Sequence, residues 1–106
     1  MARAPKRLAG PALVSNSAAT KYTVPGSTTA VVRYIHVSNP SGSAVTFTLS
    51  IGADATGTRL YNAHSIPANS LFERHVYLVL AAAEIIQAFA GTNNQLTLTI
   101  AGDEIT

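Results

Sequence analysis

Cysteine and tryptophan are both absent from this 106-residue chain, and only 11% of its residues are charged. Without cysteine there is neither a disulfide framework nor a thiolate metal site, so packing alone must stabilise the fold. An average globular protein carries about 25% charged residues, and charge keeps a monomer in solution. The low charge therefore indicates a surface hidden against copies of the chain or other partners. The alternative is a small, Thr-rich soluble domain.

The positive charges are concentrated near the N-terminus. Residues 1–21 contain no acid and four basic residues, which are Arg3, Lys6, Arg7 and Lys21. A nucleic-acid-binding protein usually carries its basic residues on a folded face. The distribution therefore argues against nucleic acid as a partner.

Long apolar runs are also missing. The basic start of the chain is not followed by the apolar region of a signal peptide. The longest apolar stretch, residues 76–90, is interrupted by Glu84 and Gln87 and is too short to span a bilayer. We expect a protein that is made in a cytosol and does not bind a membrane.

What the chain does contain is alternation. Apolar residues alternate with small hydroxylated residues over residues 45–51 and again over 96–100. A period of two places the apolar side chains on the core face of a strand and the hydroxyls on the other face. The predicted core residues are Val45, Phe47, Leu49, Ile51, Leu96, Leu98 and Ile100. The residues expected on the solvent face are Thr46, Thr48 and Ser50.

Segments with strand character recur about every ten residues, with turn signals between them. They cover residues 22–25, 31–37, 44–51, 58–64, 71–79 and 94–101. Residues 1–18 include two prolines and a glycine, so we interpret them as an extended basic arm without core contacts. The sequence predicts an all-β protein: an antiparallel β-sandwich or jelly roll of about seven to eight strands, comprising residues 19–106 and preceded by this arm.

Residues 78–89 are compatible with two structures. Their alanines favour a helix, on which Leu78, Ile85 and Phe89 would share one face. However, no N-cap precedes the segment, and all its neighbours are predicted strands. We favour a strand, a short turn at Ala82-Ala83 and a second strand, with the helix as the alternative.

The residue types that carry chemistry form no recognisable constellation. His36, His64 and His75 lack the spacing of metal ligands, and Glu73 beside His75 on one strand is only a weak metal candidate. Asp54 is the single acid of its loop, so we expect it to cap that turn through its own backbone rather than bind calcium. The sequence therefore predicts no catalytic, cofactor-binding or metal-binding residues, and a protein that is not an enzyme.

Several turn and strand motifs follow one another between residues 20 and 102. They are Tyr22-Thr23-Val24-Pro25, Val31 to Asn39, Phe47 to Gly52, Ser65-Ile66-Pro67-Ala68-Asn69-Ser70 and Leu80 to Ala88. In this order they resemble the small β-sandwich virion accessory proteins of tailed bacteriophages, of the capsid-decoration or minor-tail type. Ala83 departs from the pattern, because the corresponding corner of that family usually has glycine.

The resemblance implies a non-enzymatic structural component of a virion, bound to the capsid or tail and made in the host cytoplasm. Its partners would be other virion proteins and further copies of itself. Arginine is enriched at interfaces, so Arg33, Arg59 and Arg74 are expected to form interface ion pairs. The arm residues Arg3, Lys6 and Arg7, together with Lys21 just after the arm, are expected to lie along a neighbouring subunit. Deletion of residues 1–18 would then leave the domain folded.

A second function remains open. Tyrosine rings can stack on sugars, and the chain has four of them, Tyr22, Tyr34, Tyr61 and Tyr77. Tyrosine is also an ordinary strand residue, and tryptophan, the strongest stacking platform, is absent. A glycan-binding recognition module for the host surface is therefore the alternative function.

Overall fold

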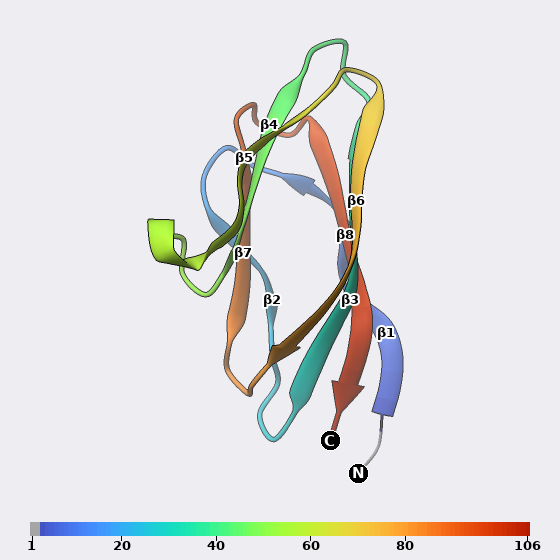
Figure 1. Ribbon diagram of the computed structural model, residues 1–106, viewed down its shortest axis with the longest axis vertical. Helices are drawn as coiled ribbons and strands as arrows, with labels where there is room; N and C mark the ends of the chain where they lie inside the picture. Colours follow the sequence, from blue (N-terminus) through green and yellow to red (C-terminus); the bar gives the residue numbers. More distant parts are fainter. Residues whose placement is uncertain (1–2) are drawn as a thin grey trace.

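The computed structural model describes residues 3–106, which form eight strands and one short 3₁₀ helix (Figure 1). The strands are β1 (Arg3–Val14), β2 (Ala19–Thr23), β3 (Thr29–Asn39), β4 (Val45–Ile51), β5 (Arg59–Ile66), β6 (Ser70–Leu80), β7 (Ile85–Ala90) and β8 (Leu96–Ile105), and the helix is η1 (Thr56–Thr58). The all-β prediction is confirmed.

The strands form two antiparallel four-stranded sheets packed face to face (Figure 1). The first, here called the β1 sheet, has the order β1-β8-β3-β6, and the second, the β2 sheet, has the order β2-β7-β4-β5. The pairs β1–β8, β2–β7, β3–β6 and β4–β5 are nested, as if one long hairpin were wound into two layers. This is the arrangement of an eight-stranded jelly roll.

The core lies between the two sheets and contains the predicted residues. Six of the seven are almost fully buried, and the seventh, Ile51, packs partly exposed against them. Phe47 of β4 is fully buried, and its ring centroid lies 6.3 Å from that of Phe72 on β6. This contact links the two sheets, because β4 and β6 belong to different layers.

The N-terminal segment is a strand of the sandwich and not an arm. β1 pairs with β8 over almost its whole length, and Leu8 and Val14 contribute to the core. The prediction of an extended arm over residues 1–18 is therefore wrong, although residues 1 and 2 lie outside the described part of the chain. β1 is an edge strand, and prolines such as Pro5 and Pro11 are tolerated at an edge because one side of the strand needs no ladder hydrogen bond.

Residues 78–89 form the predicted strand, turn and strand, and the helical alternative is wrong. Ala83, in the turn, has φ of 71°, a left-handed conformation that glycine adopts more easily. Two contacts hold it there: the Ala83 N–H donates to the Val24 carbonyl, and the Ala81 N–H donates to Glu84 Oε1. The turn therefore tolerates alanine where the resembling family has glycine.

A bulge in β3 reverses the alternation of its side chains. The register shifts between Val32 and Tyr34 against both neighbouring strands. Val32 faces the core before the bulge, and Ile35 faces it after the bulge. Arg33 and Tyr34 consequently both lie on the outer face of the β1 sheet.

Candidate protein-interaction surface

The outer face of the β1 sheet gathers aromatic and histidine side chains from two adjacent strands. Tyr34 of β3 lies opposite His75 of β6, and His36 lies opposite Glu73. The Tyr34 hydroxyl donates to Glu73 Oε2, and this hydrogen bond raises the pKa of the tyrosine. The Tyr34 ring centroid is 4.9 Å from that of His75 and 6.1 Å from that of His36. We call these four residues the Tyr34 cluster.

Exposed apolar side chains flank the Tyr34 cluster. Leu71, Tyr77 and Val79 are 51%, 64% and 61% exposed, and alternation along β6 places all three on the outer face. Leu13 of β1, 55% exposed, lies in the same cross-strand row as Leu71. The β1 sheet thus presents apolar groups to water at both of its edge strands.

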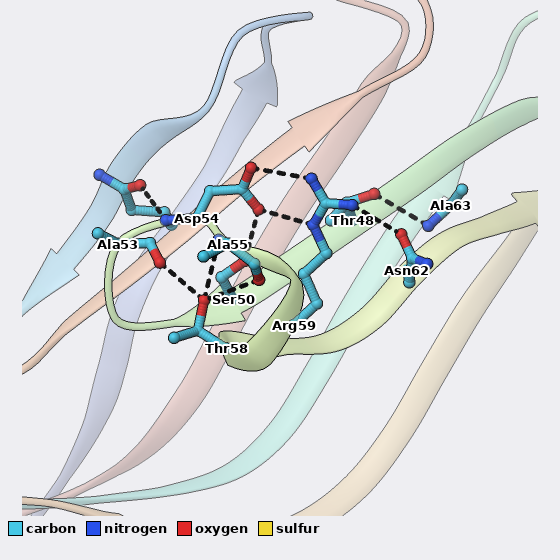
Figure 2. Close-up of polar contacts among 10 residues, drawn as sticks. Thr48, Ser50, Ala53, Asp54, Ala55, Thr58, Arg59, Asn62 and Ala63 are labelled. Atoms are coloured by element: carbon cyan, nitrogen blue, oxygen red, sulfur yellow. Dashed lines mark hydrogen bonds and ion pairs between the residues drawn. The ribbon is translucent and has the colours of Figure 1, made fainter.

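Part of the outer face of the β2 sheet is covered by a loop of the same chain (Figure 2). The loop of residues 52–58 returns over β4, where the Asp54 carboxylate accepts hydrogen bonds from Arg59 Nε at 2.9 Å and Nη2 at 3.0 Å. Ser50 Oγ donates to the same carboxylate at 2.8 Å. Chiefly Arg59, and then Ser50, lower the pKa of Asp54. The expectation that Asp54 caps the backbone of its own turn is wrong.

The predicted solvent face of β4 is wrong for two of its three residues. Thr48 and Ser50 are 2% and 1% exposed, so they are buried rather than solvated. Thr48 Oγ1 accepts a hydrogen bond from the Ala63 N–H at 2.9 Å (Figure 2). Gln87 of β7 accepts from the Asp54 N–H at 2.9 Å and donates to a threonine of β2, which extends the network across the sheet.

Three of the seven basic residues predicted at an interface contact acids of β8. Arg3 and Arg33 lie 3.5 Å and 3.2 Å from the carboxylate of Asp103. Lys6 lies 3.2 Å from the carboxylate of Glu104. These contacts tie β1 and β3 to the strand between them, so the three basic residues have an internal role.

Glu104 also joins the two sheets. It accepts a hydrogen bond from the Tyr22 hydroxyl of β2 at 2.5 Å. This bond, followed by the influence of Lys6, lowers the pKa of Glu104. The pKa of Tyr22 is raised, first by burial and then by Glu104.

The other four predicted interface residues lie in separate places. Lys21 Nζ donates to a backbone carbonyl of β1, and Arg59 is engaged by Asp54. Arg74 lies over the Phe72 ring, with its guanidinium carbon 4.4 Å from the centroid. Arg7 is exposed on β1 and has no ion-pair partner within residues 3–106. The structure does not bring the seven together into one patch.

Within residues 3–106 no three metal-ligating side chains are grouped, and the surface has no pocket. Glu73 and His75, the weak metal candidates, are instead connected through Tyr34. No helix in this part of the chain is long and apolar enough to cross a membrane.

The sequence reading missed the exposed apolar residues of β6. A signal was present, because on either side of Glu73-Arg74-His75 the residues 71–72 and 76–80 are apolar at both odd and even positions. A strand that is apolar on both faces needs cover on both. Searches of family models, curated proteins and solved structures found no match for this chain.

Proposed function

We propose that this chain is a non-enzymatic structural component of a tailed-phage virion, an accessory subunit that decorates the capsid or tail and binds neighbouring virion proteins. The observation that carries the proposal is the outer face of the β1 sheet, where Leu13, Leu71, Tyr77 and Val79 are each more than half exposed. Exposed apolar groups gathered on one face are typical of a protein interaction site. A neighbouring subunit would remove them from water.

The state of the acids supports binding over catalysis. Each of the five acids in the chain has a partner that holds the sandwich or one of its turns together. The partners are Arg59 for Asp54, Tyr34 for Glu73, the Ala81 N–H for Glu84, Arg3 and Arg33 for Asp103, and Lys6 and Tyr22 for Glu104. A general acid or base must instead be within reach of a substrate proton.

Two further observations are compatible with the proposal. The ordered motifs between residues 20 and 102 resemble those of phage virion accessory proteins. Eight-stranded jelly rolls also occur in viral capsid proteins, although they occur in lectins too, and a fold alone does not determine function.

Quantitative mass spectrometry of gradient-purified particles tests the proposal. The particles are those of the phage whose genome encodes the chain. We expect the chain at a fixed ratio to the major capsid protein, retained after a high-salt wash, and electron cryomicroscopy would then assign it to the capsid or tail. Host proteins that vary between preparations serve as the control. Absence of the chain from washed particles would contradict the proposal.

The Tyr34 cluster favours one alternative, a glycan-binding module for the host surface. Tyr34 and Tyr77 present rings on one face, and aromatic rings can stack on sugars. Calorimetry with host surface polysaccharide separates the two functions. A virion subunit of the proposed kind shows no binding, whereas binding that is lost in Tyr77→Ala and kept in Tyr61→Ala would favour the glycan module.

A further inference from the structure

The two sheets leave four edge strands, and these differ in how well they are protected from pairing with another chain. β1 carries Pro5 and Pro11, and β2 has only five residues. β5 is interrupted by Ala63, at φ of 49°, and by two register shifts against β4. β6 has eleven residues and contains no lysine, proline or glycine. It is therefore the edge most open to a further strand.

We propose that a second copy of this chain pairs with β6 in the antiparallel direction, across a two-fold axis at His75. The two β1 sheets would then form one continuous eight-stranded sheet. This inference rests on the proposed role as a subunit that packs against its neighbours, and it specifies the surface and the partner. Because β6 runs from residue 70 to residue 80, His75 is its midpoint, and an axis there pairs the strand along its whole length.

The side chains of β6 match one another in this register. On the outer face, Leu71 of each copy lies opposite Val79 of the other, and Glu73 lies opposite Tyr77. On the core side, Phe72 lies opposite Leu78. Four of the apolar residues therefore face apolar residues, and the carboxylate faces a residue with a hydrogen-bond donor. Arg74 lies opposite Val76, and the two copies of His75 lie opposite each other on the axis.

Neighbouring registers are less favourable. An axis at Arg74 places the two copies of that arginine directly opposite each other, and an axis at Glu73 does the same for two carboxylates. Like charges directly opposite destabilise a strand pair. An axis at Val76 avoids this but places both charged residues opposite apolar ones, Glu73 opposite Val79 and Arg74 opposite Leu78. The axis at His75 has only one such mismatch, Arg74 opposite Val76. Charge and apolar pattern together therefore select the axis at His75.

Pairing at this edge also accounts for the exposure of Leu71 and Val79 in a single copy of the chain. Directly opposite residues on antiparallel strands have Cβ atoms about 4.5–5.5 Å apart, so each leucine would contact a valine of the second copy. The free N–H and C=O groups along β6 would gain partners in the same step.

Sedimentation of the isolated, full chain over a range of concentrations tests the pairing by a charge swap. Wild-type protein is expected to dimerise. Leu71→Lys and Val79→Glu should each weaken the dimer about tenfold or more, because each places a charge opposite an apolar side chain. The double variant should regain most of the affinity, since each introduced lysine then faces an introduced glutamate of the other copy.

Matched controls lie on the other edges. Leu13→Lys on β1 and Leu60→Lys on β5 change exposed leucines and should leave the dimer unchanged. Urea unfolding of every variant confirms that the monomer is folded. A chain that stays monomeric at high micromolar concentration overturns the inference. So does a dimer that tolerates Leu71→Lys, or a double variant that stays dissociated.

The outcome is separable from that of the virion proposal. A β6 dimer that is absent from particles would keep the pairing and remove the virion function. A chain found in particles but monomeric in isolation, and incorporated equally well with Leu71→Lys, would remove the pairing alone.

Discussion

The two outer faces of this sandwich differ in which side chains they bury and which they expose to water. On the β2 sheet, Thr48 and Ser50 are buried, and their hydroxyls are hydrogen-bonded to Ala63 of β5 and to Asp54 of the loop of residues 52–58. On the β1 sheet, Leu71 and Val79 remain more than half exposed. These two hydroxyls are thus buried and these two apolar side chains are open to water, the reverse of what residue type alone suggests.

Whether a side chain on an outer face is buried therefore depends on the hydrogen-bond partners available to it as well as on its own polarity. Burying a hydroxyl carries little penalty when a partner is supplied, and here the loop supplies Asp54 for Ser50 while β5 supplies the Ala63 N–H for Thr48. The β1 sheet has no comparable cover within residues 3–106. One face is therefore completed by this chain, and the other is free for a second chain to complete.

Removing β1 should have the largest effect on stability, because it takes a whole strand out of the β1 sheet. Deleting residues 1–14 takes Leu8 and Val14 out of the core and exposes the flank of β8. We expect loss of cooperative thermal unfolding, measured by circular dichroism. Arg7→Ala keeps the strand and should retain the transition. A sharp, unshifted transition in the truncated chain would show that the β1 sheet does not need its first strand.

Phe47→Ala tests the core that both sheets share. The fully buried ring should leave a cavity, with a loss of about 3–5 kcal/mol in the free energy of unfolding measured in urea. Phe47→Leu, which leaves a smaller cavity, should lose less. A loss below about 1 kcal/mol would mean that β4 turns its other face inward.

A pair of matched substitutions compares the outer faces directly. Thr48→Val removes the acceptor of the Ala63 N–H and should lower stability by about 1 kcal/mol. Thr97→Val changes a threonine on the outer face of the β1 sheet and should change it by less than about 0.5 kcal/mol. Chemical denaturation measures both, and equal losses would contradict the difference between the faces.

Lowering the pH should have the smallest effect on stability, and we expect this effect to arise from the Asp54–Arg59 pair on the β2 sheet. Arg59 and Ser50 hold the pKa of Asp54 below its ordinary 3.8, so the unfolded chain takes up a proton first as pH falls. The contribution of Asp54 is therefore complete above about pH 5 and declines as pH falls through 3.8 and below. Urea midpoints from pH 7 to pH 3 should fall less steeply in Asp54→Asn.

Asn62→Ala is the control for the acid experiment. Asn62 contacts the same arginine but carries no charge, so its loss should leave the slope with pH unchanged. An Asp54→Asn variant with the wild-type slope would show that the Arg59 pair does not stabilise the folded state.

The strands of this fold could be predicted wherever alternation was clean. Residues 45–51 and 96–100 alternate without interruption, and both are central or well-packed strands with one face in the core. The turn near Ala83 was predictable because strands flank it and no helix start precedes it. These features are determined by residues close together in the sequence, so the pattern of neighbouring residues is enough to predict them.

Features that depend on distant residues could not be predicted. β1 lacks alternation because only Leu8 and Val14 of this strand are buried in the core, and its place at the edge of the sheet lets it tolerate prolines. The bulge at Arg33 and Tyr34 changes which residues face the core without any marker in the sequence. The basic residues expected at an interface are partly engaged within the chain, as in Arg3 with Asp103, a contact between opposite ends of the sequence.

The nested pairing of strands has a consequence for how the molecule is made. As the chain leaves the ribosome, partners become available from the inside outward: β4 with β5, then β3 with β6, β2 with β7, and finally β1 with β8. The Asp54–Arg59 pair spans five residues at the start of this order, and Arg3–Asp103 spans nearly the whole chain at its end. Because long-range pairs close slowly, β1 waits longest of these eight strands for its neighbour.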